Sequence, residues 1–489
     1  MTSTAKPTVI FRADGSARTG LGHLFRCAAL SRMLRPYYRT VLQYAEAPPP
    51  VIAQLRKAFD ELRAGPQGQG ERSSNSVVVF DGYHFGPDDH AAAGPGPVVC
   101  IDDIHAHPFD VDLVINHAPI PNLVNNYRLG PKTTFAGGLA YALLRPAYLE
   151  AARRPIGEED RERFFICFGG SDHRNVTTSL LRQLTALGYD RPVDVVLGAA
   201  NVHTGSVTAA ATHYPGEVHL YHSLDDTSML QRYQHARLAF LPASTVLVEA
   251  MAAGVPTITG YYVDNQINIY RGICALGLSV GIGDWNEPDD LRTAIERVQE
   301  AGVGESTAPA RRYVDGYSDL NLRQLFDQLP ARKPLLAVRP AQPGDMMTYF
   351  HWANDPGVRS AAIQTAAIPL EDHRGWFHRR LDDKSSLLLI FHYRNAPCGQ
   401  LRYDLSRGTA LVDISVDPTF RGGGLARRFL ALGEEQLRYR HPDVERIEAR
   451  VRPENAASAR TFAGSGFARV AAVTEGGLEL LRFEKRLSP

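Results

Sequence analysis

Short apolar runs alternate with helical patterns along the first two thirds of the chain. Each run is rich in β-branched side chains and bounded by Gly, Pro or Asp: residues 9–11, 77–80, 98–101 and 113–115. Such runs are typical of strands buried on both faces of a parallel sheet. Between them, the spacing of apolar residues predicts helices over residues 24–34 and 51–62.

The same rhythm restarts near residue 164 and breaks near residue 330. The further strand-like runs are residues 164–168, 193–197, 238–241 and 257–259, and a new unit begins at residues 336–340. Two successive α/β lobes followed by a third unit are the simplest arrangement. We therefore expect an α/β chain with two Rossmann-like lobes, residues 1–155 and 156–333, and an α+β domain over residues 334–489.

Composition narrows the classes of function. The 489 residues carry 53 basic and 53 acidic side chains, which gives no general attraction to nucleic acid or to an anionic membrane. Five scattered cysteines form no disulfide framework, and none of the 17 histidines has metal-ligand spacing. The start lacks a signal-peptide pattern, and no apolar run approaches ~18 residues. These features predict a cytoplasmic protein without a metal site or a membrane segment.

A glycine-rich turn after the first predicted strand carries candidate catalytic chemistry. Arg12 and Asp14 follow the strand, and Gly20-Leu21-Gly22-His23 leads into the next helix. Glycines let a ligand approach the backbone, and free N–H groups at a helix start bind anions. The helix dipole disfavours a charged imidazolium there, so a neutral His23 is a candidate general base. The alternative is an ordinary turn followed by a capping histidine.

Polar residues also stand at the ends of the other predicted strands. Asp81 and Tyr83 follow one strand, Asp102-Asp103 a second, and Asn116 a third. Each residue alone is typical of a turn. Because the carboxyl ends of the strands form the ligand crevice of doubly wound sheets, the set together predicts a binding crevice.

The second lobe has two loops suited to phosphate. Gly170-Ser171-Asp172 follows one strand, and Ser244-Thr245 opens a helix whose hydroxyls and amides are able to bind an anion. A capping box would need Glu or Gln three positions after the cap, which is not the case here. Glu249 is therefore left for ribose hydroxyls, and Asn265-Gln266 adds amides suited to a sugar.

These motifs occur in one order over roughly residues 8–330. They are Arg12-x-Asp14, Gly20-x-Gly22-His23-x-x-Arg26, Asp81-x-Tyr83, Ile101-Asp102-Asp103, Tyr141-x-x-Leu144-Arg145-Pro146, Gly169-Gly170-Ser171-Asp172 and Asn265-Gln266. Together they resemble the UDP-2,4-diacetamido-2,4,6-trideoxy-β-L-altropyranose hydrolases of pseudaminic acid biosynthesis. The fold of that family is similar to the GT-B glycosyltransferases.

The resemblance implies metal-independent hydrolysis of a UDP-sugar, with His23 orienting or deprotonating the water that attacks the anomeric carbon. Asp14 is implied as a second catalytic residue, either as the partner of His23 or on a sugar substituent. One departure is Ala243, which stands where a glycine is expected and narrows the phosphate loop. The implied substrate-binding residues are Arg12, Gly20, Gly22, Arg26, Asp81, Tyr83, Asp103, Tyr141, Arg145, Gly170, Ser171, Asp172, Ser244, Thr245, Glu249, Asn265 and Gln266.

The last third carries a second set of motifs. Residues 412–416 alternate apolar and polar side chains as a half-buried strand does, and Arg421-Gly422-Gly423-Gly424-Leu425-Ala426 then leads into a helix through residue 437. Amides of such a loop face one concavity and bind pyrophosphate. With Asn455-Ala456-Ala457-Ser458 and Gly466-Phe467, residues 336–485 resemble the GNAT N-acetyltransferases.

The GNAT resemblance implies acetyl-CoA as co-substrate. Phe462 stands where a tyrosine commonly protonates the departing thiolate. Upstream residues resemble the substrate side of acetyltransferases that modify UDP-amino-sugars, and they imply contacts from Trp352, Arg359 and His373; the alternative for Trp352 and Trp376 is a place in the core. The implied coenzyme contacts are Ser415, Val416, Arg421, Gly422, Gly423, Gly424, Leu425, Ala426, Asn455 and Ser458.

The two resemblances together suggest a bifunctional enzyme. The C-terminal domain would acetylate the 4-amino group of a UDP-4-amino-4,6-dideoxy sugar, and the N-terminal lobes would hydrolyse the product to UDP and the free sugar. Two alternatives stay open for the N-terminal lobes: a GT-B glycosyltransferase that needs an acceptor, and a non-catalytic UDP-sugar-binding module. The sequence leaves the oligomeric state open.

Overall fold

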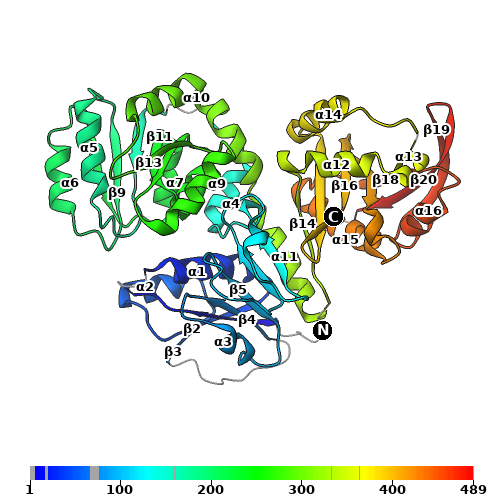
Figure 1. Cartoon of the computed structure of the whole chain (residues 1–489), viewed down its shortest axis with the longest axis horizontal. Helices are drawn as coiled ribbons and strands as arrows, with labels where there is room; N and C mark the ends of the chain where they lie inside the picture. The colour runs from blue at the N-terminus through cyan, green and yellow to red at the C-terminus, as the bar shows by residue number, and fades with distance from the viewer. Residues whose placement is uncertain are drawn as a thin grey trace. The chain divides into compact units, whose positions relative to one another are not determined.

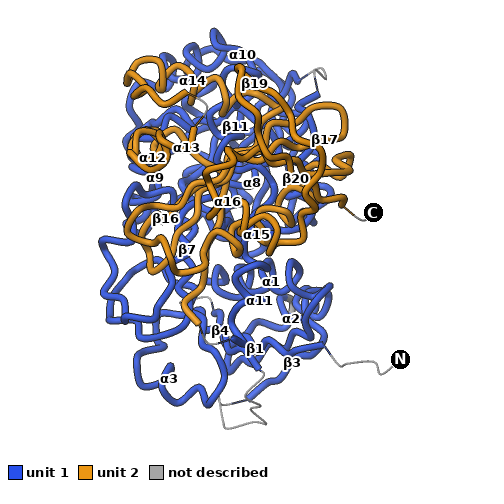
Figure 2. Tube along the Cα trace, turned by 90° about the vertical axis from the view of Figure 1, so that its right-hand side faces the viewer, with its two compact units in different colours: residues 1–332 blue, residues 333–489 orange. Residues whose placement is uncertain are grey.

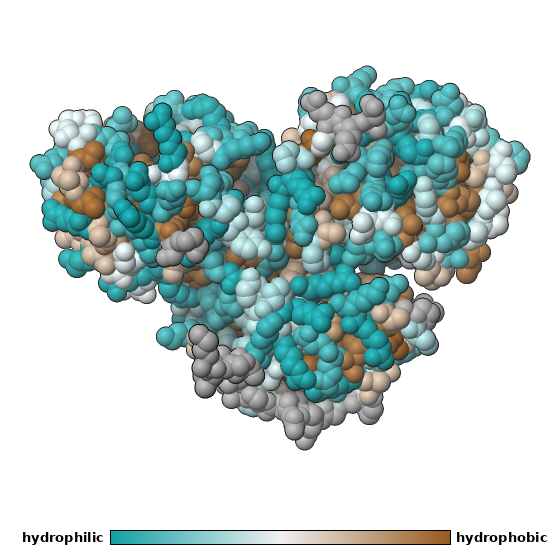
Figure 3. Space-filling model, turned by 180° about the vertical axis from the view of Figure 1, so that it is seen from behind, coloured by the Kyte–Doolittle hydropathy of each residue, from teal (hydrophilic) through white to brown (hydrophobic). Residues whose placement is uncertain are grey.

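The computed structural model describes residues 6–16, 20–65, 76–157, 161–331, 333–362 and 364–487. The chain divides into two compact units, residues 1–332 and 333–489 (Figure 2). The molecular face shown in Figure 3 is mostly hydrophilic, with hydrophobic residues in small separate patches. No helix within these described ranges is both long enough and apolar enough to cross a membrane.

The first unit begins with a doubly wound parallel sheet (Figure 1). In the described residues its seven strands follow the order β3-β2-β1-β4-β5-β6-β7. The strand order reverses between β1 and β4, so the loops that follow these two strands flank the ligand crevice expected of such sheets. The strands are β1 (Thr8–Ala13), β2 (Arg39–Tyr44), β3 (Glu61–Ala64), β4 (Ser76–Asp81), β5 (Val98–Ile101), β6 (Leu113–Asn116) and β7 (Thr134–Gly137). The helices are α1 (Gly22–Leu34), α2 (Pro49–Leu55), α3 (Pro87–Ala91), α4 (Pro146–Arg153) and the 3-10 turns η1 (Leu123–Asn126) and η2 (Leu139–Tyr141).

A second parallel sheet repeats this topology. Among the described residues its six strands follow the order β10-β9-β8-β11-β12-β13, so the order reverses between β8 and β11. The strands are β8 (Arg163–Ile166), β9 (Val193–Leu197), β10 (Val218–His222), β11 (Ala236–Pro242), β12 (Thr257–Tyr261) and β13 (Val280–Asp284). The helices are α5 (Val176–Ala186), α6 (Thr204–Ala211), α7 (Asp226–His235), α8 (Thr245–Ala252), η3 (Asp264–Gln266), α9 (Ile267–Ala275), α10 (Leu291–Tyr313, with non-helical Gly302), α11 (Ser318–Gln328) and η4 (Leu329–Ala331).

The two sheets belong to one compact unit because the end of the second lobe returns to the first. Helix α11 packs against α1 and η2. The Ser318 hydroxyl donates to the Ala142 carbonyl at 2.7 Å, and the Asn321 amide donates to the Ala140 carbonyl at 2.8 Å. The sequence division near residue 155 separates the two sheets, but these contacts couple the lobes.

The apolar runs predicted the buried strands correctly, and every residue of β4, β5 and β6 is buried. The predicted helix over residues 51–62 is wrong in its second half, because α2 ends at Leu55 and β3 begins at Glu61. Strand β3 pairs with β2 alone, and its residues are half-buried or exposed. An edge strand of this kind lacks the apolar run that marks a buried one.

The second unit is built on a mixed sheet. Its seven described strands follow the order β14-β15-β16-β17-β18-β20-β19, and β17 and β18 are parallel while the other pairs are antiparallel. The strands are β14 (Leu336–Pro340), β15 (Ser386–Tyr393), β16 (Ala396–Ser406), β17 (Thr409–Val416), β18 (Arg446–Val451), β19 (Ala468–Glu475) and β20 (Leu478–Arg486). The helices are η5 (Pro343–Asp345), α12 (Met346–Ala353), α13 (Pro356–Ala361), α14 (Leu370–Asp382), η6 (Pro418–Phe420), α15 (Leu425–Arg440) and α16 (Ala456–Ala463). The predicted fold class of two Rossmann-like lobes and an α+β domain is confirmed.

Candidate active sites

His23 lies in the first turn of α1, at the reversal point of the first sheet, and pairs with a carboxylate. Its Nδ1 is 2.7 Å from Oδ1 of Asp81, the last residue of β4. The His23 side chain is 7% exposed and that of Asp81 is 0% exposed. The chain folds this way because α1 follows β1, and β1 and β4 are neighbours in the sheet.

Arg26, one helical turn after His23, joins this pair to the next strand. Its guanidinium donates to both oxygens of Asp81, at 3.0 and 2.6 Å, and to Oδ2 of Asp103 at 2.6 Å. Burial alone would raise the pKa of Asp103, but the charge of Arg26 and its hydrogen bond outweigh burial and lower it. Tyr83 packs edge-on against the His23 ring, with centroids 4.6 Å apart. Partial burial, together with the charge of Asp103, raises the pKa of Tyr83 to about 12.

The hydrogen bonds assign the tautomer of His23. Arg26 Nη2 carries two hydrogens: it donates one to Asp81 Oδ1 at 2.6 Å and lies 2.8 Å from Nδ1, so its contact with the ring fits either tautomer and the contact with Asp81 decides. If Nδ1 were unprotonated, its lone pair would face that of a carboxylate oxygen at 2.7 Å. Nδ1 therefore carries the hydrogen and donates it to Asp81, which leaves Nε2 as an acceptor. This is the arrangement of a general base oriented by a carboxylate.

The partner of His23 is Asp81 and not Asp14. Asp14 Oδ1 instead accepts the backbone N–H groups of Ala45 and Glu46, at 2.6 and 2.9 Å. Its Oδ2 lies 3.2 Å from His84 Nε2. Of the two roles that the sequence left open for Asp14, contact with a sugar substituent is the one that remains a prediction.

The other residues of the first lobe lie around the same turn. Arg12 is buried, and its guanidinium lies 5.3 Å from the centre of the Phe80 ring. Gly20 has φ +79°, which favours glycine, and it exchanges hydrogen bonds with Ser16. A Cβ on Gly22 would meet nothing within 4 Å, so the backbone at the start of α1 is open to a ligand.

In the second lobe, the loop after β8 is tightly packed. Asp172 is 1% exposed, and its carboxylate accepts the N–H groups of Val176 and Thr177 at 2.8 and 3.0 Å. It therefore caps α5 and is not aimed at a ligand, contrary to the predicted substrate contact. A Cβ on Gly198 would lie 2.3 Å from the Gly170 carbonyl oxygen, so this glycine, which the motifs did not include, positions the loop.

Ser244 is the N-cap residue before α8, but its side chain makes no capping hydrogen bond. It is half-buried and Thr245 is exposed. This agrees with the sequence argument that the two hydroxyls do not form a capping box. The predicted phosphate contact is compatible with this geometry and stays a prediction.

Glu249 has a partner that the sequence did not predict. It is 4% exposed, and Oε1 accepts from Arg145 at 2.7 and 3.1 Å. Burial raises the pKa of Glu249 against the opposing effect of Arg145. Arg145 also pairs with Asp226 and donates to Tyr148 at 3.0 Å. The predicted ligand residues Arg145 and Glu249 thus join α4 to α8, and only Oε2 of Glu249 is left for a ribose.

Three further residues of the first unit, all in 3-10 turns, were predicted to contact the substrate. Tyr141 is 3% exposed within η2. Gln266 is 8% exposed, and its side-chain oxygen accepts the N–H of Tyr262 at 3.1 Å, whereas Asn265 is exposed. Of this pair, Asn265 alone presents its side chain freely.

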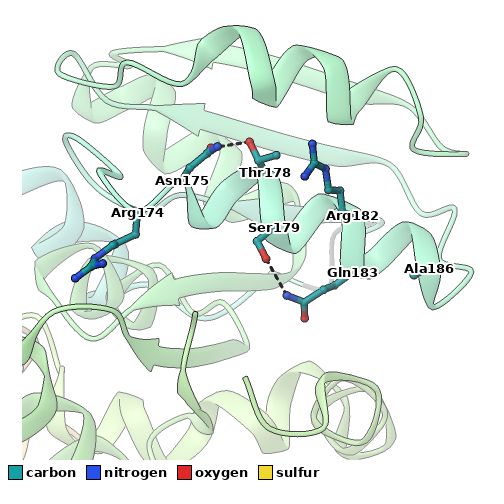
Figure 4. Close-up of a pocket in the computed structure, with 7 residues that line it drawn as sticks. All are labelled: Arg174, Asn175, Thr178, Ser179, Arg182, Gln183 and Ala186. Atoms are coloured by element: carbon teal, nitrogen blue, oxygen red, sulfur yellow. Dashed lines mark hydrogen bonds between the residues drawn. The ribbon is translucent and has the colours of Figure 1, made fainter. Parts of the chain in front are cut away.

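A surface pocket along α5 does not coincide with the predicted site. It is lined by Arg174, Asn175, Thr178, Ser179, Arg182, Gln183 and Ala186 (Figure 4). Two hydrogen bonds join polar side chains of this pocket: Thr178 donates to Asn175 at 2.6 Å, and Gln183 donates to Ser179 at 3.1 Å. None of these lining residues belongs to the predicted set.

The second unit has an opening between two parallel strands. Strands β17 and β18 pair only at residues 409–411 with residues 446–448. Beyond Leu411, the strands diverge within the described residues, so the predicted contacts Ser415 and Val416 lie on a free strand edge. Such an edge pairs with an extended amide-bearing ligand much as with a peptide.

The glycine loop that follows this edge has the expected geometry. Gly422 and Gly424 have φ +81° and +73°, and a Cβ on either would meet nothing within 4 Å. Gly424 precedes the first turn of the 16-residue helix α15, which begins with Leu425 and Ala426. Free N–H groups of this turn suit a pyrophosphate. The residues present therefore fit acetyl-CoA.

Other predicted coenzyme contacts have partners within the protein. Arg421 pairs with Asp355 and donates to the Val416 carbonyl at 3.1 Å. Asn455 caps α16 by accepting the N–H of Ser458 at 3.0 Å. Phe462 is 3% exposed and packs against other phenylalanine rings, so this position supplies no acid.

The predicted acceptor-side residues lie mostly in a small aromatic cluster. Trp352 is 5% exposed and packs there with Tyr349 and Phe377, and its Nε1 donates to Asp417 at 2.8 Å. His373 is 2% exposed and packs against Phe377 and Trp376, and burial lowers its pKa. Arg359 donates to backbone carbonyls of residues 364 and 366. The core alternative is right for Trp352, and its predicted substrate contact is not supported.

Comparison with known proteins supports both parts of the chain. Residues 336–468 match the family profile described as "Acetyltransferase (GNAT) domain". This confirms the predicted acetyltransferase domain and, with it, the prediction that the chain is an enzyme. Two solved acetyltransferases are also similar to the chain over 31% of its length, at TM-scores of 0.28 that carry no further argument. One, bound to coenzyme A and kanamycin, acts on aminoglycosides (18% identical, 94% covered), and the other is spermidine N-acetyltransferase from Vibrio cholerae (15% identical, 95% covered).

The first unit has curated relatives. A UDP-2,4-diacetamido-2,4,6-trideoxy-beta-L-altropyranose hydrolase of Campylobacter jejuni is 22% identical over 289 residues, which cover 56% of this chain and 98% of that protein. The match is longer than the C-terminal unit, so it extends into the first. The predicted resemblance is thereby confirmed. An uncharacterized protein of Methanocaldococcus jannaschii is 21% identical over 290 residues, covering 53% of this chain, which spans about half (56%) of that relative's length.

Proposed function

We propose that the chain is a bifunctional enzyme of pseudaminic-acid-type biosynthesis. Its GNAT domain acetylates the 4-amino group of a UDP-4-amino-4,6-dideoxy sugar, and its first unit hydrolyses the resulting UDP-2,4-diacetamido-2,4,6-trideoxy sugar to UDP and free sugar. The observation that carries the proposal is the buried His23–Asp81 pair at the reversal point of the first sheet. The similarity to the Campylobacter jejuni hydrolase supports the substrate class. A GT-B-like arrangement of the lobes and a cytoplasmic location belong to the same proposal.

In the hydrolytic step, His23 Nε2 accepts a proton from water as the water oxygen bonds to the anomeric carbon. The bond between that carbon and the phosphate oxygen breaks, and UDP leaves with the bonding electrons. Asp81 accepts a hydrogen bond from Nδ1 and stabilises the imidazolium that forms. Arg26 holds Asp81 in place and supplies positive charge beside it.

In the acetyl transfer, acetyl-CoA supplies an activated acyl group, and the sugar amine displaces the coenzyme thiol. The free edge of β17 and the turn of Gly422 to Ala426 would hold the coenzyme. Asp355 keeps Arg421 beside that turn. Trp352 fixes the preceding segment through Asp417, which also caps the Thr419 N–H at 2.8 Å.

The test is incubation with acetyl-CoA and candidate UDP-4-amino sugars, with free thiol and UDP followed separately. We expect thiol release first and UDP release after it, without an added acceptor. Thiol release without UDP would leave only the transferase, and UDP release that requires a sugar acceptor would indicate a glycosyltransferase.

His23→Ala is the matched variant for the hydrolytic step. We expect UDP release to fall by about 10²- to 10⁴-fold, the usual contribution of a general base. Thiol release should be unchanged, because the GNAT domain is a separate compact unit. An unchanged rate of UDP release would rule out His23 as the base.

A further inference from the structure

A second histidine of the first unit lies at the same edge of the sheet. His117 immediately follows β6, and β6 neighbours β5, whose end carries Asp102 and Asp103. Arg26, Asp103 and Asp81 are close enough to act on its pKa. His117 therefore lies at the same end of the sheet as the charged residues around His23. The motifs of the sequence did not include it.

The protonation state of His117 follows from one hydrogen bond. The backbone N–H of Leu143 donates to its Nδ1 at 3.2 Å. Nδ1 is thus an acceptor, and in a neutral ring the hydrogen must be on Nε2. Burial, then the positive charge of Arg26, lowers the pKa of His117 to about 4, while Asp103 and Asp81 act in the other direction. The ring is neutral at physiological pH with a donor at Nε2.

That donor is available to a ligand. The side chain of His117 is half-buried, and among the described residues no group bonds to its Nε2. His23 has the opposite tautomer, with the hydrogen on Nδ1 and an acceptor at Nε2. The carboxyl end of the sheet thus carries one imidazole assigned as an acceptor at Nε2 and one assigned as a donor at Nε2.

We propose that His117 is a second substrate-contacting residue of the hydrolase site and donates from Nε2–H to an oxygen of the bound UDP-sugar. This inference rests on the proposed hydrolysis. A neutral donor stabilises the negative charge that develops on a leaving diphosphate oxygen without giving up its proton. A carbonyl or hydroxyl oxygen of the sugar would accept the same hydrogen bond, and UDP affinity separates the two.

The experiment compares two variants of the full chain. His117→Leu removes both ring nitrogens, whereas His117→Gln keeps an acceptor for Leu143 N–H and an N–H donor on the other atom. We expect His117→Leu to lower kcat/KM for UDP release at least ~10-fold, toward the ~10²–10³-fold loss seen when a transition-state donor is removed. His117→Gln should recover most of this loss. Thiol release by the GNAT domain serves as an internal control and should not change.

A matched control is His90→Leu. His90 is also a buried histidine of the first lobe whose pKa burial lowers to about 4, but it contacts Cys100 and the ring of Phe80 instead of the crevice. Its loss should leave UDP release unchanged. If UDP inhibits His117→Leu more weakly than wild type, the donor contacts the diphosphate; equal inhibition with slower turnover assigns it to the sugar.

Two results would overturn the proposal: a wild-type rate in His117→Leu, or equal losses in His117→Leu and His117→Gln. If wild type releases no UDP, the proposed function fails instead. Calorimetric titration of the UDP-sugar into His23→Ala, with and without His117→Leu, then still tests the contact. Equal affinities in that pair would refute it.

Discussion

Replacing Asp81 by asparagine tests the electrostatic design of the site. In the structure, both oxygens of Asp81 accept: Oδ1 from His23 and from Arg26, and Oδ2 from Arg26. Either orientation of the new amide places its NH₂ group against a donor. With NH₂ toward His23, the ring is driven to the other tautomer and Nε2 no longer accepts a proton; with NH₂ toward Arg26, the guanidinium loses a charged partner.

The magnitudes follow from burial and from the remaining partners. Asp81 is 0% exposed, so an unpaired buried donor costs about 1–3 kcal/mol and the lost charge adds to this. Asp103 still pairs with Arg26, which limits the total to about 2–4 kcal/mol of unfolding free energy, below the usual cost of breaking a buried pair. Loss of the correct tautomer should slow UDP release by about 10²- to 10⁴-fold.

UDP release under saturating sugar nucleotide gives kcat, and denaturant unfolding of the same samples gives stability. Asp102→Asn is the matched control, because Asp102 directly follows the buried strand β5 but accepts from His105 N–H at 2.7 Å and Tyr127 OH at 2.8 Å. It should lose stability while keeping kcat within about threefold. Folded Asp81→Asn protein with a wild-type kcat would refute the assigned role of the pair.

The remaining predictions concern structure and coenzyme binding. Arg145→Met should destabilise the first unit by about 2–4 kcal/mol because it leaves the buried carboxylate of Glu249 without its cation, whereas Asp226 still pairs with Arg32. Glu249→Gln should cost less, and equal losses by denaturant unfolding would contradict this asymmetry. The pKa of Glu249 in the folded protein is raised, so the folded state binds a proton more readily than the unfolded state. The unfolding free energy of wild type should therefore increase relative to that of Glu249→Gln as the pH falls from 7 toward the ordinary pKa of glutamate. The opposite trend would show that burial is not the dominant effect on this carboxyl. Gly422→Ala should raise KM for acetyl-CoA and cost about 1 kcal/mol or more of unfolding free energy at φ +81°. The φ of Gly423 is not in the left-handed region, so Gly423→Ala should keep the wild-type stability in denaturant unfolding.

Much of the fold was open to prediction from local pattern. Apolar runs marked the central strands of both parallel sheets, because a strand buried on both faces must be apolar along its whole length. The edge strand β3 was missed for the same reason. It pairs with β2 alone and its residues are half-buried or exposed, so its sequence contains no apolar run. The glycine turn before α15 was also predictable from the sequence, because a backbone position with positive φ favours glycine.

The sequence by itself determined the central strands of the two parallel sheets, the glycine turns and the location of His23 at a helix start, because each depends on residues close together in the chain. Only the tertiary structure decided the partners. Asp81 is 58 positions from His23, and Glu249 is 104 positions from Arg145, so no local spacing relates them. The same holds for the tautomer of His117, which a backbone N–H 26 residues away assigns. Whether a histidine accepts or donates depends on which distant group the fold places against its other nitrogen.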